Sequence, residues 1–488
     1  MFKKYRSILA ILFAGLLIGV TSCGEGFLER YPRESIASEE ALTTIEGVEG
    51  ALAGLYNRFQ AGEYNHREMN LAGELLSDQM DIAQTNAGRM TNHPTNEEGA
   101  GFGIWTRVYN DINRANSILY YIDDIEDADE TLVNEFKGQA HALRAWMYFD
   151  LLRIYARPYM HQEPFVQGEP LGVIYKTKPF AGIDETTFEA RGTIEEGYQL
   201  VLDDLYAALG YLSDDEYPYQ FTEAAVLGTL ARVYLYMGKW SEAANYAEAA
   251  IDHPSTELIH ADNFDDYMTL FADAPGAESI LELGYTEADR PGMNTSVAGM
   301  AIYCEETGEG YGDVILRQDL IQLLDSYGAE GHPAGDMYYE AVKGGQLCAF
   351  QKKYHSHRGY AYWDDIKMMR TSEMYFIAAE AHAEMGDLNQ AEEFLMTLRE
   401  HRGMEHVDIN VDSAEEFIDV LFTDKRVEYF SEMSHRWFDL RRRGMDITKG
   451  VPDEDAGTPV DFDDYRVVER IPTAEISANE NCVQNPGY

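Results

Sequence analysis

Apolar residues recur along most of the chain with the three- and four-residue spacing of amphipathic helices. One set comprises Val108, Ile112, Ala115, Leu119 and Ile122, and similar sets lie within 143–154 and 194–212. This spacing places the members of a set on one face of a helix, and that face has to pack against another element. Alternating strand patterns are few and short. The sequence therefore predicts a mainly α protein.

Signals for helix ends agree with this prediction. Thr193 with Glu196, and Ser413 with Glu416, have the spacing of a capping box at a helix start. Gly444 follows a run of polar and aromatic residues and is typical of a helix end.

Two segments, 225–251 and 373–399, look like copies of one unit. Small residues occur at matching positions in the two segments: Ala231, Gly238 and Ala243 in the first, and Ala379, Gly386 and Ala391 in the second. Alanines allow two antiparallel helices to approach closely, and the glycine permits the turn between them, as in tetratricopeptide helix pairs. An unrelated pair of helical hairpins is the alternative interpretation.

Glycine-rich segments interrupt the helical pattern. Residues 276–360 contain 13 glycines, and 84–104 are rich in Asn, Thr and Gly. Such density indicates loops, which commonly carry binding groups on a rigid scaffold. We therefore expect one domain, 23–488, in which a helix-pair scaffold carries a large irregular insertion. Its predicted parts are an N-terminal helical part at about 38–255, a loop-rich ligand-binding part at about 256–366 and a C-terminal helical part at about 367–488.

The first 22 residues have the layout of a secretory signal peptide. Lys3, Lys4 and Arg6 precede an apolar run at 8–20, which is too short for a comfortable membrane span. The following residues, Val-Thr-Ser-Cys23, resemble a bacterial lipobox, so we expect 1–22 to be a lipoprotein signal peptide and Cys23 to be acylated. An ordinary signal peptide with a chance cysteine is the alternative.

Charge and cysteine content exclude several classes of protein. The 488 residues carry a formal net charge of -48, and removal of 1–22 takes away three cations and leaves -51. A nucleic-acid-binding protein, or one held electrostatically on anionic lipid, needs a basic face. Cys304, Cys348 and Cys482 remain after Cys23, which is too few for a disulfide scaffold and shows no metal-ligand spacing. His355 and His357 are too isolated to predict a metal site, and no cofactor motif occurs.

Several motifs follow one another along nearly the whole chain. They are Cys23 followed by Phe-Leu-Glu-Arg-Tyr-Pro, and the segments 105–116, 142–151, 191–205, 436–442 and 471–488. Together they resemble the SusD/RagB family of outer-membrane nutrient-binding lipoproteins. One departure is Lys425 before Arg426, where the family usually has an acidic residue.

The resemblance implies ligand capture without catalysis. Members are held on the outer face of the outer membrane by their lipid alone, and they cover a TonB-dependent, SusC-like transporter. They deliver oligosaccharides or polysaccharides to it or, in some members, peptides. No catalytic residue, metal or cofactor is implied, and neither is a nucleic-acid partner.

Aromatic and polar residues in the irregular segments are the candidates for glycan binding. Sugar rings stack their C–H faces on aromatic rings, and their hydroxyls bond to amide and charged groups. The candidates are Asn86, Arg89, Asn92, Phe102, Tyr285, Tyr303, Tyr311, Tyr360 and Trp363. Packing at the surface is the alternative role for each. Trp105, Trp146, Trp240 and Trp437 are expected in the core, and the Arg436–Arg443 cluster is expected to be structural at a helix C-terminus.

Two other functions stay open on the sequence. One is a secreted helical glycoside hydrolase or lyase; with 86 acidic residues, the presence of carboxylate pairs decides nothing. No nucleophile elbow, HExxH motif or P-loop supports an enzyme. The other is a peptide-binding member of the same family.

Overall fold

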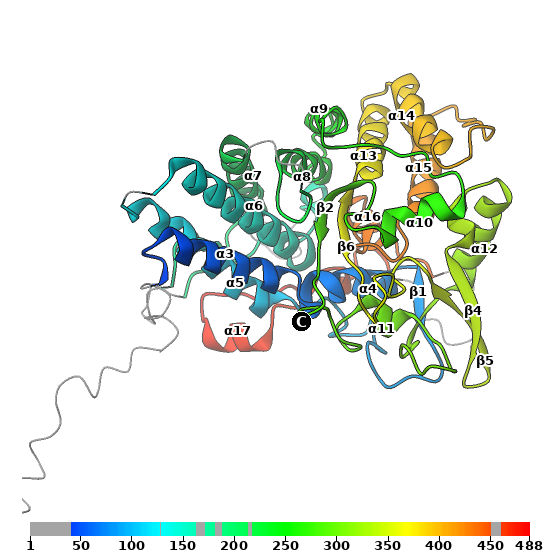
Figure 1. The fold of residues 1–488 in the computed structure, drawn as a ribbon, viewed down its shortest axis with the longest axis horizontal. Helices are drawn as coiled ribbons and strands as arrows, with labels where there is room; N and C mark the ends of the chain where they lie inside the picture. Colours follow the sequence, from blue (N-terminus) through cyan, green and yellow to red (C-terminus); the bar gives the residue numbers. More distant parts are fainter. Residues whose placement is uncertain (1–40, 127, 163–170, 181–187, 213–216, 450–459) are drawn as a thin grey trace, which may run out of the picture.

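The computed structural model describes residues 41–126, 128–162, 171–180, 188–212, 217–449 and 460–488, so the predicted signal peptide and Cys23 lie outside the described residues. Helices dominate, as predicted (Figure 1). The N-terminal half contains α3 (Ile45–Phe59), α4 (Glu68–Leu76), α5 (Trp105–Tyr121), α6 (Glu130–Tyr155), α7 (Ile194–Tyr211), α8 (Glu223–Tyr236) and α9 (Trp240–Ile251).

The second half alternates helices with short strands. Its helices are α10 (Phe264–Ala272), α11 (Val297–Ala301), α12 (Gln318–Ala329), α13 (Thr371–Glu384), α14 (Leu388–Glu400), α15 (Ala414–Glu428), α16 (His435–Arg442) and α17 (Thr473–Ala478). Three antiparallel two-stranded sheets pair β1 (Met80–Ile82) with β3 (Val314–Leu316), β2 (Ser279–Leu283) with β6 (Ile366–Arg370), and β4 (Tyr338–Lys343) with β5 (Gln346–Gln351).

The two repeated segments form helix pairs, which confirms the tetratricopeptide-like prediction. Segment 225–251 supplies α8 and α9, and 373–399 supplies α13 and α14. Gly238 (φ 66°) and Gly386 (φ 84°) adopt the left-handed conformation at the two turns. Helix α9 also packs against α13, so the two pairs form one continuous stack although about 120 residues of chain separate them (Figure 1).

Capping chemistry explains where two of the helices begin. At the start of α7, the Thr193 hydroxyl accepts a hydrogen bond from Glu196 N (3.1 Å) and Thr193 N donates to the Glu196 carboxylate (2.8 Å), as the capping box predicts. At the start of α15, Ser413 accepts from Glu416 N, but the Glu416 carboxylate accepts from Asp412 N. The second capping box is therefore only half formed.

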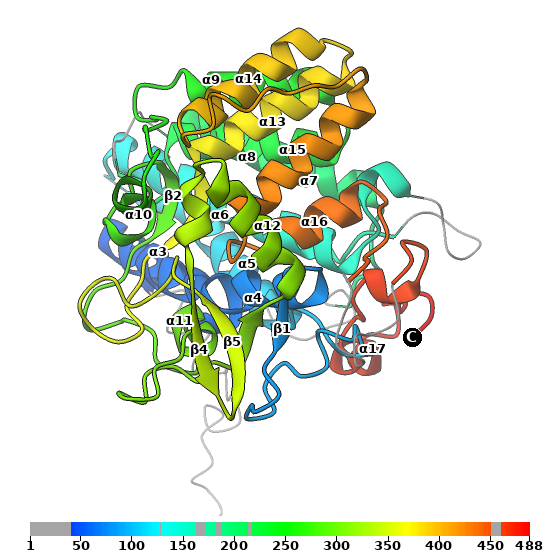
Figure 2. The same ribbon diagram turned by 90° about the vertical axis from the view of Figure 1, so that its right-hand side faces the viewer.

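Residues 276–360 are less irregular than the glycine content predicts. They contain β2, β3, β4 and β5 as well as α11 and the twelve-residue helix α12. Figure 2 shows the β4–β5 hairpin as a long arm beside α11, at the opposite end of the molecule from α14. Many of the glycines lie at turns between these short elements, such as Gly344 and Gly345 between β4 and β5. The segment is therefore rich in loops, as predicted, but its loops connect short strands and two helices.

One hydrophobic core runs through both halves, from Leu42 to Cys482. Trp105, Trp146 and Trp437 are buried in it as expected, whereas Trp240 is only partly buried. None of the helices in the described ranges combines the length and apolar character that a membrane span requires.

The arginine cluster of α16 has the predicted structural role, with partners inside the protein. Arg442 is buried and pairs with Glu380 and Asp439. Arg441 donates to the backbone carbonyls of Arg153 and Ala156, so it caps the C-terminal end of α6.

Candidate ligand-binding site

The loop between β5 and β6 is fastened to the core by a fully buried lysine. Lys353 Nζ donates to Glu428 O (2.6 Å) and to the Glu432 carboxylate (2.7 Å). Arg370 at the end of β6 binds the carboxylates of the same two glutamates, at 2.7 and 2.9 Å. We call Lys353, Arg370, Glu428 and Glu432 the anchor cluster. It joins the start of the loop, through Lys353, and the far end of β6, through Arg370, to α15 and the turn that follows α15.

Internal hydrogen bonds hold the rest of this loop in one shape. The Asp364 carboxylate accepts from Ser356 N and His357 N, both at 2.9 Å. The Ser356 hydroxyl accepts from Tyr362 N at 2.8 Å. Ser356 (φ 63°) and Tyr362 (φ 66°) are left-handed without being glycine, a strained conformation that persists where the surroundings enforce it. The loop is thus a rigid support for its side chains.

Two of the predicted residues, Tyr360 and Trp363, form an aromatic pair on this loop. Their ring centroids lie 5.7 Å apart and their planes are tilted by 31°. Tyr360 is 48% exposed, and Trp363 is partly buried and donates from Nε1 to Tyr285 O (3.1 Å). The orientation of the indole is therefore fixed while part of the ring surface faces solvent.

Arginines border the aromatic pair. The Arg290 guanidinium lies 5.1 Å from the Tyr360 ring centre, and the Arg358 guanidinium lies 5.0 Å from that of Trp363. Arg358 also pairs with Asp365, whose pKa is raised to about 6 chiefly by burial. We call Tyr360, Trp363, Arg290 and Arg358 the aromatic platform. Stacking rings with hydrogen-bond donors at their edge suit a sugar ring.

A groove with a volume of about 470 Å³ lies beside the same loop. This volume is within the range of small-molecule sites. The walls come from α10, from the segment after α11, from β4 and from the loop itself: Phe264, Met268, Tyr303, Cys304, Tyr339, Lys352, His355 and His357. The Tyr339 hydroxyl accepts from Tyr303 N (2.8 Å) and donates to Tyr303 O (3.1 Å), so the two tyrosines are fixed relative to each other.

The remaining predicted residues lie near Tyr303 or in local turns. Arg89 stacks on the Tyr311 ring (3.7 Å) and pairs with Asp313 (3.0 Å). Asn86 stabilises its own turn through Ala83 O and Gly88 N. Asn92 contacts His93 Nδ1 at 3.0 Å. Of the two, Asn86 is exposed and Asn92 partly buried.

Two predicted glycan-binding residues are buried, which corrects the sequence prediction. Phe102 is 1% exposed and stacks on Phe438 in the core. Tyr285 is 6% exposed, and its hydroxyl donates to Gln60 O (2.5 Å). Neither ring offers a surface to a ligand, so both are removed from the candidate site.

Several site residues were missed by the sequence reasoning. Arg358 directly precedes Gly359 and Tyr360 and could have been included with its neighbours. Tyr339 and Phe264 carry no such signal, because they belong to a strand and a helix that reach the groove only in the folded chain.

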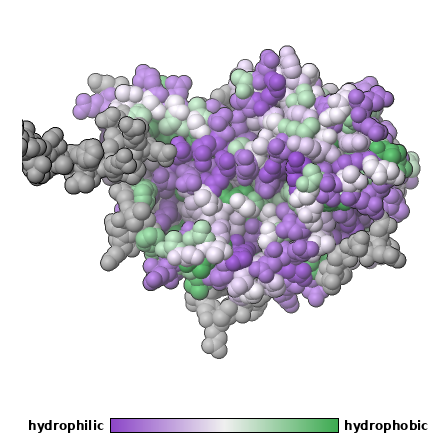
Figure 3. Space-filling view, turned by 90° about the horizontal axis from the view of Figure 1, so that it is seen from below, coloured by the Kyte–Doolittle hydropathy of each residue, from purple (hydrophilic) through white to green (hydrophobic). Residues whose placement is uncertain are grey.

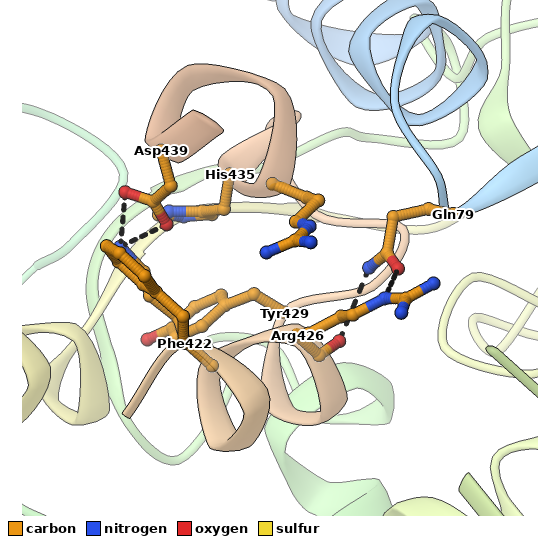
Figure 4. Close-up of a pocket in the computed structure, with 8 residues that line it drawn as sticks. Gln79, Phe422, Arg426, Tyr429, His435 and Asp439 are labelled. Atoms are coloured by element: carbon orange, nitrogen blue, oxygen red, sulfur yellow. Dashed lines mark hydrogen bonds and ion pairs between the residues drawn. The ribbon is translucent and has the colours of Figure 1, made fainter. Parts of the chain in front are cut away.

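A second, much smaller pocket lies between α15 and α16 (Figure 4). It measures about 10 Å³ and is lined by Gln79, Arg426, His435 and Asp439 among others. That volume holds roughly one water molecule. Lys425, the departure from the family pattern, pairs with Asp439 here (2.9 Å). The pocket is thus part of the structural ion-pair network and is too small for a ligand.

The face of the molecule shown in Figure 3 is mostly hydrophilic, and its apolar side chains form small separate groups. Among the described side chains on this face, none gather into a broad apolar patch of the kind that marks an obligate protein interface.

Comparisons with known proteins identify the family. Residues 26–235 match a family described as "Starch-binding associating with outer membrane", and residues 345–488 match the "SusD family". SusD-like protein P38 of Formosa agariphila is 24% identical, over 90% of this chain and 92% of that relative.

Solved structures agree over nearly the whole chain. A candidate sugar-binding protein of Bacteroides vulgatus has a TM-score of 0.79 and 26% identity, and the likeness covers 91% of this chain and 99% of that one. A laminarin-binding SusD-like protein has a TM-score of 0.67 and 20% identity, covering 90% and 99%. The two family matches together span more than half of the sequence, in the order that the motifs predict. The chain belongs to the SusD/RagB family.

Proposed function

We propose that this protein is a cell-surface lipoprotein that binds oligosaccharide or polysaccharide nutrients without altering them. In this proposal it delivers them to a SusC-like, TonB-dependent transporter of the outer membrane. Cys23 carries the lipid that tethers it there. Membership of the family supports this role, since one matched family is described as starch-binding and as associating with the outer membrane.

The observation that carries the proposal is the aromatic platform. Tyr360 and Trp363 lie on a loop whose shape is fixed by the hydrogen bonds of Asp364. The ion pair of Lys353 with Glu432 attaches the same loop to the core. A site fixed before binding loses little conformational entropy when a sugar stacks on it. The groove, which the same loop lines through Lys352, His355 and His357, adds Tyr303 and Tyr339.

Removal of an exposed ring of the platform should weaken glycan binding. We expect Tyr360→Ala to lower the affinity for a bound oligosaccharide about tenfold, because stacked rings contribute on the order of 1 kcal/mol or more. Binding would be measured by calorimetry on the detergent-solubilised full chain, against oligosaccharides from starch, laminarin and plant cell walls, and against a peptide library.

Tyr120→Ala is the matched control, because Tyr120 is 56% exposed and lies at the end of α5. It should leave the affinity unchanged. A preference for peptides over every glycan, or the release of reducing ends from the polysaccharides, would contradict the proposal.

Lipid attachment is tested separately. Cys23→Ser should release the protein from the membrane fraction, since two acyl chains provide stable anchoring. Cys304→Ser is the control: it removes a different thiol and retains Cys23, so this variant should stay membrane-bound. Co-purification of the wild-type chain with an outer-membrane barrel tests the transporter partnership; a wild-type preparation that never carries a barrel argues against it.

A further inference from the structure

The composition of the groove contrasts with that of the whole chain. The protein has 86 acidic residues against 38 Lys and Arg. Among the described residues that line the groove, none is Asp or Glu, whereas one is lysine and two are histidines. The other walls are apolar or aromatic. The groove is therefore a locally cationic and apolar surface on a strongly acidic protein.

Lys352 is the cation of the groove. Its Nζ donates to Asp336 O (2.8 Å) and lies 5.2 Å from the Phe264 ring centre. Within the described part of the chain, no carboxylate forms an ion pair with this ammonium group. Its neighbour Lys353, in contrast, is buried and forms an ion pair with Glu432. Lys352 has two further donor positions on its ammonium group that an anion could occupy.

The two histidines lie next to this lysine. His357 Nε2 donates to the carbonyl oxygens of Lys352 and Lys353 (3.0 and 3.1 Å), which holds its ring against the same stretch of backbone. The His355 ring packs on Tyr339 with centroids 5.4 Å apart, and 6.4 Å separates it from the His357 ring. Both imidazoles thus belong to the wall that carries the lysine.

We propose that the groove binds the acidic group of an anionic glycan, a carboxylate or a sulfate, with Lys352 as its main partner. This inference rests on the proposed function and specifies its ligand class. The aromatic walls formed by Tyr303, Tyr339 and Phe264 take the apolar face of the sugar. The ammonium group of Lys352 takes the charge, and the histidines add donors.

Protonation links this binding to pH. The pKa of His355 is lowered, first because neighbouring groups exclude water from its ring and second because of the charge of the nearby His357. A bound anion favours the protonated imidazole, so binding should tighten as the pH falls. The charged groups that face His355 are His357, Asp364 and Glu309. The Asp364 carboxylate accepts hydrogen bonds from two backbone N–H groups, which fix its position in the loop.

The test compares matched glycans on the full chain in detergent. Oligogalacturonate is paired with the same oligosaccharide after reduction of its carboxyl groups, and a sulfated galactan oligosaccharide is paired with its desulfated form. We expect one acidic member to bind about tenfold tighter than its neutral partner, as a charge-assisted bond provides. The acidic arm that binds identifies carboxylate or sulfate as the charge recognised.

Variants separate the role of Lys352 from a general effect of charge. Lys352→Gln should lower the affinity for the acidic glycan about tenfold, toward that of its neutral partner. Lys239→Gln removes the same charge from an exposed position at the start of α9 and should change neither. Lowering the pH from about 6.5 to about 5 should strengthen binding of the acidic glycan alone, because the lowered pKa of His355 places its protonation below the ordinary histidine range.

Each outcome decides between the two proposals. Equal affinity for the acidic and neutral members of both pairs, or an acidic preference that survives Lys352→Gln, overturns the anionic ligand and leaves the proposed function intact. Absence of binding to any glycan, neutral or acidic, overturns the proposed function itself.

Discussion

Glu74 on α4 is a buried carboxyl group, and no cation among the residues that the structure describes forms an ion pair with it. It is fully buried, and one of its oxygens accepts a hydrogen bond from Ser431 N (3.1 Å). Burial is the main reason that its pKa is raised to about 8. At neutral pH the group is therefore mostly protonated in the folded protein and ionised in the unfolded chain.

This difference makes stability fall as the pH rises. Between about pH 4.5 and pH 8 the folded state holds a proton that the unfolded state has lost, which costs about 1.4 kcal/mol per pH unit. We expect Glu74→Gln, which keeps the shape without the titration, to flatten the free energy of unfolding across this window. Urea denaturation at several pH values measures it. Asp365 and Glu469 have raised pKa values of about 6 and 7 and affect the pH dependence of the wild type and of the variant equally. Their contribution therefore cancels when the two profiles are compared. Parallel pH profiles for the two proteins would contradict the assignment.

The exposure of a ring can be predicted where the local sequence determines it, whereas glycan binding by Tyr360 and Trp363 stays a prediction. Tyr360 and Trp363 lie in a polar loop whose own hydrogen bonds fix them, so the local sequence carries the signal. Phe102 lies in an equally glycine-rich stretch, yet it is buried because Phe438 of α16 covers it. Contacts between residues so far apart along the chain leave no local pattern, so composition cannot distinguish the two cases.

At the scale of elements, the helix pairs were predictable because their spacing is a local property. The strands were not, since β2 pairs with β6 across a long stretch of chain and each sheet has only two strands. In β4, outward-facing Glu340 and exposed Val342 alternate with partly buried residues, so no continuous apolar run marks the strand.

Whether the turn of the second helix pair requires a left-handed glycine can be tested by comparing Gly386, which lies in that turn, with Gly54, which lies within a helix. Gly386 has φ of 84° and open space around the position of a Cβ atom, so the strain of Gly386→Ala comes from the backbone alone. We expect a loss of about 1 kcal/mol in the free energy of unfolding. Gly54 lies within α3, also with open space, and Gly54→Ala should raise stability by about 0.5–1 kcal/mol. Effects of the same sign on thermal unfolding would show that the turn does not need its left-handed conformation.

At the scale of the whole molecule, buried charges connect the loop to the scaffold. Breaking a buried ion pair by removal of one partner costs about 3–5 kcal/mol, because the other charge stays desolvated. We expect Lys353→Met to lower stability by this amount and also to weaken glycan binding, since the loop that carries the platform loses its support. Denaturant unfolding and calorimetry measure the two effects.

The adjacent lysine is the control for this prediction. Lys352→Gln alters the same loop at a partly exposed position and should leave the free energy of unfolding within about 0.5 kcal/mol of the wild-type value. If Lys353→Met were as stable as Lys352→Gln, the anchor cluster would not be what fixes the loop.

Because α9 packs on α13, the two ends of the segment that connects them, residues 252–370, lie close together. The scaffold is already closed at that junction, and the intervening segment begins and ends at the same place. The entropy of closing such a segment changes only slowly with its length. Evolution can therefore lengthen, shorten or exchange residues 252–370 without rebuilding the helical stack, so one framework can carry many different sets of loops.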